Sequence, residues 1–110
     1  MFVEKFTRDG MVAVLISTGF GAGWSTWNAD HKEFFLFDKG LVELAQEGAT
    51  KFAVEDYLYK NLTGVTEYID VSGWRDIDIR WVDEGTNFTI DEYDGRESIN
   101  VRNDTNWIIA

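Results

Sequence analysis

A glycine-rich segment, TGFGAGW at positions 18–24, is the first place where backbone chemistry is expected. It follows an apolar run, as the phosphate-binding loops of nucleotide enzymes follow a strand. The dinucleotide fingerprint needs a glycine where Trp24 stands, and the phosphate loop needs a lysine followed by serine or threonine. Because both patterns fail, two interpretations stay open. The glycines form either a turn that lets Trp24 and Trp27 reach the core, or a ligand loop.

The ligand-loop interpretation describes a sponge that sequesters a small nucleotide signalling molecule. Such a site needs backbone N–H donors, aromatic rings that stack on the base, and an arginine that meets the phosphate. These roles fall to Gly21 and Gly23, to Trp24 and Trp27, and to Arg75 or Arg80. The net negative charge of the chain should repel an anionic nucleotide, although a local pocket of arginines can outweigh that repulsion.

A group of carboxylates around Gly95 is the second candidate for chemistry. It consists of Asp91, Glu92, Asp94 and Glu97. With Gly95 as the sixth residue of a calcium loop, the first and last ligand positions fall on Ile90 and Val101, so the pattern fails. One histidine and no cysteine also disfavour transition-metal sites. We predict no metal and no cofactor. Because no nucleophile with an adjacent base is visible either, we predict that the chain is not an enzyme.

The acidic residues fit an interaction surface better than a catalytic one. A net charge of −10 argues against direct binding to nucleic acid or to an anionic membrane, because both need a basic partner. We predict a surface that imitates a nucleic-acid backbone and docks on the basic groove of another protein. Its carboxylates and aromatic anchors are Asp76, Asp78, Asp91, Glu92, Asp94, Trp74 and Tyr93. A purely solubilising acidic face is the alternative.

Hydrophobic periodicity predicts the elements of the N-terminal half. Asp9-Gly10 separates an alternating stretch from the apolar run 11–17, which predicts a hairpin with a buried second strand. Asp38 should cap a helix over 39–46, and Thr50 should cap another that ends near residue 61. The stretch 30–37 fits a short helix or a strand.

The C-terminal half changes to strand periodicity. In the strand 76–81, Ile77, Ile79 and Trp81 alternate with charged residues, so Asp76 and Asp78 should lie on a solvated face. A strand beginning at residue 88 should lie beside it and place Asp91 nearby. Turns are predicted at 84–85 and 94–95, followed by a strand over 98–101. Residues 107–109 should dock on the core.

Strands, then helices, then strands predict one α+β domain over residues 1–110. We expect an antiparallel sheet of about five strands with two or three helices packed on one face. The N-terminus shows no signal-peptide pattern, no apolar run approaches the roughly 20 residues of a membrane span, and cysteine is absent. These features predict a cytoplasmic protein. A homo-oligomer that uses the aromatic residues between subunits stays open as an alternative.

Two segments carry a resemblance to other proteins. The segment GFGAGWSTWN at 19–28 and the segment that runs from GWRDI at 73–77 through EYDG at 92–95 resemble short uncharacterised proteins encoded by bacteriophages. The resemblance extends through FDKGLVEL at 37–44. It brings no activity or site residues with it. It implies an accessory protein made inside a bacterial host, and small acidic proteins of that kind often bind host machinery such as nucleases, defence effectors and polymerases.

Overall fold

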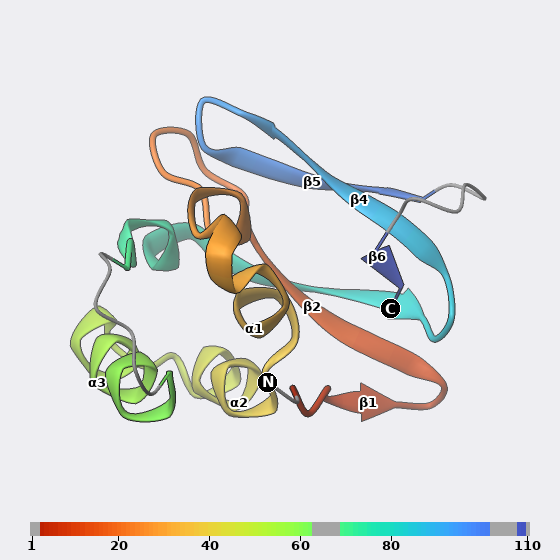
Figure 1. Cartoon of the computed structure of the whole chain (residues 1–110), viewed down its shortest axis with the longest axis horizontal. Coiled ribbons are helices and arrows are strands. Elements are labelled where there is room, and N and C mark those ends of the chain that lie inside the picture. Colours follow the sequence, from red (N-terminus) through yellow and green to blue (C-terminus); the bar gives the residue numbers. More distant parts are fainter. Residues whose placement is uncertain (1–2, 63–68, 102–107, 110) are drawn as a thin grey trace.

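The computed structural model of the chain describes residues 3–62, 69–101 and 108–109, and strand β2 (Met11–Ser17) lies at its centre. All of β2 except its first residue is buried. The helices pack on one side of this strand, and a second sheet packs on the other (Figure 1). A strand that is covered on both faces needs a continuous apolar run rather than an alternating one, which is the pattern of residues 12–16.

The first sheet has the order β1-β2-β3, and both of its pairings are antiparallel. β1 (Thr7–Arg8) is short, and β3 (Ile77–Asp83) runs the whole length of β2. Asp9 and Gly10 connect β1 to β2 with φ angles of 53° and 78°. The predicted N-terminal hairpin is therefore confirmed, with a first strand that begins at Thr7.

The second sheet has the order β5-β4-β6 and is also antiparallel. Its strands are β4 (Asn87–Tyr93), β5 (Arg96–Val101) and β6 (Ile108–Ile109). Asp94 and Gly95 join β4 to β5 with φ angles of 49° and 88°, which is the two-residue turn that the Asp-Gly pair predicts.

Side-chain caps define where the longer helices begin. Asp38 Oδ2 accepts a hydrogen bond from Leu41 N at 3.1 Å, and Thr50 Oγ1 accepts one from Ala53 N at 3.2 Å. Both predicted caps are confirmed. The ambiguous stretch 30–37 is helical. The helices are α1 (Lys32–Phe37), α2 (Lys39–Glu47) and α3 (Lys51–Asn61). None of the described helices is long and apolar enough to cross a membrane.

Two hydrophobic cores meet at β2 because its successive side chains point to opposite faces. Ala13 and Leu15 join the core beneath the helices. Val12, Val14 and Ile16 join a second core, which also contains the following residues of α1, β3 and β4: Leu36, Phe37, Val82 and Phe88. The second sheet closes this core.

The α+β class is confirmed, but the arrangement of the strands differs from the prediction. The described strands form two sheets instead of one sheet of about five. β3 pairs with β2, and β4 pairs with β5 and β6, so Asp91 does not lie beside Asp76 and Asp78 on a paired strand. The physical reason is the two-faced apolar character of β2, which requires a cover on each side. Trp107, which was expected to dock on the core, lies outside the described residues.

Candidate functional site

Three segments that are distant in sequence meet at one end of the molecule. They are the glycine loop (residues 18–24), the 3-10 helix η3 (Ser72–Asp76) and the β4–β5 turn. A Cβ atom on Gly73 would overlap the carbonyl of Gly23, and one on Gly95 would overlap the backbone of Ala22. Glycine is therefore needed at both positions for backbone to approach backbone.

Glu97 of β5 holds this junction together from the inside. Its side chain is 2% exposed and accepts hydrogen bonds from Ser17 N at 2.9 Å and from Trp24 N at 2.8 Å. Thr26 donates to the same carboxylate through its N and Oγ1 atoms, at 3.1 and 2.6 Å. The loop therefore binds an anion, as its glycines suggested, but the anion is a carboxylate of the chain itself. Glu97 is not part of the solvated acidic stretch to which its sequence position assigned it.

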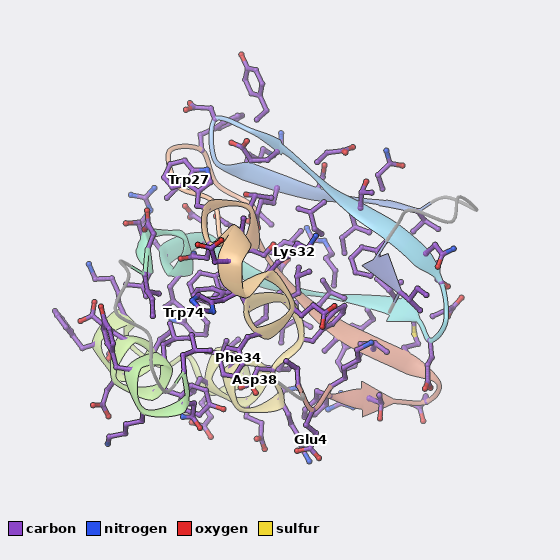
Figure 2. The ribbon with its side chains drawn as sticks, viewed as in Figure 1. Glu4, Trp27, Lys32, Phe34, Asp38 and Trp74 are labelled. Carbon is purple, nitrogen blue, oxygen red and sulfur yellow. The ribbon has the colours of Figure 1, made fainter. Side chains whose placement is uncertain are left out.

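The tryptophans divide between the core and the surface. Trp24 is fully buried, and its Nε1 donates to Phe35 O at 2.7 Å. Trp74 is 7% exposed, and its Nε1 donates to Ala49 O at 2.8 Å. Trp27 is 42% exposed and ends the 3-10 helix η1 (Ser25–Trp27), which follows the glycine loop, whereas Trp74 lies among the helices (Figure 2). In this conformation Trp24 offers no face to a base and Trp74 offers none to a protein partner.

Exposed aromatic rings gather where the glycine loop meets the hairpin. Phe20 is 54% exposed and Tyr93 is 77% exposed, and their rings meet edge to face with centroids 6.5 Å apart. The Arg96 guanidinium lies 5.6 Å from the centroid of Phe20. These side chains border an open hollow of about 320 Å³. We call its lining the hairpin-tip surface: Phe20, Asp91, Glu92, Tyr93, Arg96 and Ser98.

Hydrogen bonds hold the acidic residues of the hairpin in defined positions. Glu92 Oε2 accepts from Gly95 N at 2.7 Å, and Asp91 Oδ2 accepts from Asn100 Nδ2 at 3.1 Å. Gly21 N donates to Asp94 O at 2.6 Å, which ties the turn to the glycine loop. All three acidic side chains are exposed. The hairpin therefore presents fixed negative charge beside exposed aromatic rings.

Four other predicted residues lie outside the hairpin tip. Arg75 and Asp76 border it, and Asp78 and Arg80 lie on β3. Arg75 forms an ion pair with Asp76 at 3.2 Å and donates to Phe20 O at 3.3 Å, so η3 borders the hairpin-tip surface. Asp78 forms an ion pair with Arg80 on β3. The structure thus gathers Asp91, Glu92, Asp94 and Tyr93, and it leaves Asp78 on the first sheet.

The alternative nucleotide site is not assembled as a pocket. Gly23 and Trp24 are buried, Gly21 is exposed, and the amide of Trp24 is committed to Glu97. Arg75 and Arg80 are both exposed and engaged with acidic neighbours. Within residues 3–62, 69–101 and 108–109, no three acidic or histidine side chains are grouped so that they could hold a metal ion.

Sequence reasoning missed Phe20, Arg96 and the buried role of Glu97. Phe20 carries no signal of its own, because only the contact with Tyr93 distinguishes it from a core aromatic residue. Glu97 did carry a signal. In β5 it alternates in phase with Ile99, which packs against the second core, so the alternation places Glu97 on the inward face of the strand.

Comparisons with known proteins add no relative to this description. Neither the protein-family models, the curated proteins nor the solved structures contain a match to the chain. The fold and the site define an α+β protein with an acidic and aromatic surface at the tip of the β4–β5 hairpin.

Proposed function

We propose that the chain is a non-enzymatic accessory protein that binds and inhibits a nucleic-acid-handling protein of a bacterial host. The hairpin-tip surface would enter the basic groove through which that protein holds nucleic acid. The resemblance to small phage-encoded proteins supports the bacterial cytoplasm as the place of action and a defence-related protein as the target.

One observation carries the proposal: Tyr93 is 77% exposed among three exposed carboxylates on a tight turn. Large aromatic residues supply much of the binding energy at protein interfaces when a partner buries them. Charged residues around such an anchor steer the encounter and select a partner of opposite charge. A basic groove is the partner that this combination favours.

The tip is held in one conformation by a short turn and hydrogen bonds, so binding should cost little conformational entropy. The turn between β4 and β5 contains only two residues, and Glu92 and Gly21 both hydrogen-bond to its backbone. A surface that is already ordered loses less conformational entropy when it binds.

The nucleotide sponge receives less support from the geometry. Of its two predicted stacking residues, Trp24 has no exposed surface and Trp27 is 42% exposed. The amide of Gly21, one of its two predicted donors, already donates to Asp94 O. The geometry therefore favours the inhibitor over the sponge.

The proposal is tested by capturing the partner and then changing the charge of the tip. Tagged protein is incubated with bacterial lysate at low salt, the retained protein is identified, and its nucleic-acid binding is measured with and without the chain. We expect salt-sensitive retention and competition with nucleic acid.

A double variant, Asp91→Asn with Asp94→Asn, should weaken binding of the identified partner by about tenfold or more. The matched control is Glu43→Gln with Glu47→Gln, which makes the same change in net charge at exposed positions of α2. Equal affinities of the two double variants would contradict a role for the tip. A partner that binds without displacing nucleic acid would contradict the inhibitory mechanism.

A further inference from the structure

The β4–β5 hairpin has one sheet face that packs on the second core and one that faces outward. Asp91 pairs with Ser98, and Tyr93 pairs with Arg96. Because alternate residues of a strand and directly opposed residues of a pair share a face, these four side chains lie together. All four are exposed, so they belong to the outward face.

The carboxylates of the hairpin tip are not neutralised by the chain. Among the described residues, the ion pairs lie on α3, on η3 and on β3, and none includes an acidic residue of the hairpin. Asp91 and Glu92 accept hydrogen bonds from neutral N–H groups alone. Arg96 is the one basic residue between positions 87 and 101, and its guanidinium lies over the ring of Phe20 instead. The carboxylates of Asp91, Glu92 and Asp94 therefore have no cationic partner within the described part of the chain.

Two aromatic rings border the same hollow, but only one of them contacts a cation. The guanidinium of Arg96 lies 5.6 Å from the ring centroid of Phe20, whereas no cation among the described residues lies over the ring of Tyr93. An arginine side chain stacks its planar guanidinium on an aromatic ring and can hydrogen-bond to a carboxylate at the same time. A lysine ammonium is a compact and strongly hydrated point charge. An exposed ring beside unpaired carboxylates therefore favours arginine.

We propose that the hollow of the hairpin-tip surface receives an arginine side chain of the partner protein, with its guanidinium stacked on Tyr93 and hydrogen-bonded to Asp91. The inference rests on the proposed function and deepens it, because it names the group of the basic groove that the tip recognises. The hollow is open and has a volume of about 320 Å³. Three carboxylates at the tip outweigh the one guanidinium of Arg96, so the charge of the surface favours a cation over an anion.

The probes are short blocked peptides of glycine and serine with one central residue, which is arginine, lysine or citrulline. Citrulline keeps the planar shape of arginine but carries no charge. Each peptide is titrated at low salt into the isotope-labelled full chain, and the NMR signals of the amides of Tyr93, Arg96 and Ser98 report binding.

We expect the arginine peptide to bind about threefold to fivefold more tightly than the lysine peptide, because the ring of Tyr93 adds a stacking contact. The citrulline peptide should bind about tenfold more weakly than the arginine peptide, because it lacks the charge. Tyr93→Leu keeps an exposed apolar side chain but removes the ring, so the preference for arginine over lysine should disappear.

Two changes of charge test the role of the carboxylate and of the chain's own arginine. Asp91→Asn should weaken both cationic peptides by about threefold or more. Asp83→Asn makes the same change at an exposed position of β3 and is the matched control, which should bind both peptides as the unchanged chain does. Arg96→Gln should strengthen binding of both cationic peptides, because it removes a like charge from the hollow.

Three results would overturn the inference. The first is equal affinity of the unchanged chain for the arginine and lysine peptides. The second is a preference for arginine that survives Tyr93→Leu. The third is an equal effect of Asp91→Asn and Asp83→Asn on binding. The peptides contain no host protein, so these results do not bear on inhibition of a captured partner. A preference for arginine, found together with a captured partner that does not compete with nucleic acid, would support the recognition of arginine and contradict the inhibitory function alone.

Discussion

The β4–β5 hairpin holds carboxylates in two contrasting settings. Glu97 is buried and accepts four hydrogen bonds from the glycine loop and its flanks. Asp91, Glu92 and Asp94 lie on the same hairpin and are exposed. All four residues carry the same carboxylate group, so their chemistry does not explain the difference. Glu97 is buried because the glycine loop covers it, and the other three are exposed because the loop does not. The inward carboxylate stabilises the fold, and the outward ones are left for a partner.

Removing the inward carboxylate should have the largest effect on stability. Glu97→Ala leaves the buried amides of Ser17 and Trp24 without an acceptor, so we expect a loss of about 3–5 kcal/mol in the free energy of unfolding. Glu97→Gln keeps one acceptor oxygen and should cost less. Urea denaturation measures both variants. A loss below about 1 kcal/mol for the alanine variant would show that the loop does not depend on Glu97.

Alanine substitutions of two glycines test the close approach of the β4–β5 turn to the glycine loop. Gly85 and Gly95 both have positive φ angles, of 86° and 88°, but only Gly95 faces the backbone of Ala22. An alanine at either position should cost about 1–2 kcal/mol through its φ angle. Gly95→Ala should cost about 1–3 kcal/mol more, because its Cβ overlaps Ala22. Equal losses in thermal or urea denaturation would contradict the packing of turn on loop.

The other buried carboxylate of the described residues, Asp38, offers a smaller effect. Tyr57 donates a hydrogen bond to Asp38 at 2.5 Å, and Tyr57→Phe should cost about 1 kcal/mol near pH 7. Burial, followed by this hydrogen bond, raises the pKa of Tyr57 above its ordinary value of 10.0.

The raised pKa gives this pair a pH signature. The unfolded chain loses the tyrosine proton first, so the stabilisation is complete below about pH 10 and declines as the pH rises above it. Urea denaturation between pH 8 and pH 11 should show a steeper decline for the unchanged chain than for Tyr57→Phe. Parallel declines would mean that Tyr57 titrates alike in both states.

The outward residues should have the smallest effect on the fold. Tyr93→Ala removes an exposed ring, so the free energy of unfolding should change by no more than about 0.5 kcal/mol. The same variant should weaken binding of a captured partner by about tenfold or more. Unchanged affinity would exclude Tyr93 as an anchor, and a large loss of stability would place it in the fold rather than the interface.

Local signals in the sequence predicted local structure well. The caps at Asp38 and Thr50 and the turns at 9–10 and 94–95 depend on neighbouring residues, and all of them are present. The division into two sheets depends on β2 being covered twice. An apolar run shows that a strand is buried on both faces, but it does not show which element covers each face.

The candidate site was predictable only in part. The exposed acids of the turn follow from the Asp-Gly hairpin signal, since a tight turn projects its flanking residues into solvent. The partnership of Phe20 with Tyr93 joins segments separated by most of the chain, and no local pattern encodes it. The alternation of Glu97 with Ile99 indicates its inward position, but its acceptor role depends on the distant loop and has no local signal.

The position of β2 also has a consequence for synthesis of the protein. β2 is made early, but its long-range partner β3 follows all three helices, and the sheet that covers its other face comes later still. Until those strands are made, the apolar run from Val12 to Ile16 has the short β1 as its only strand neighbour among the described residues, and the second sheet does not yet cover its other face. A chain that ends before β3 should therefore expose an aggregation-prone apolar strand.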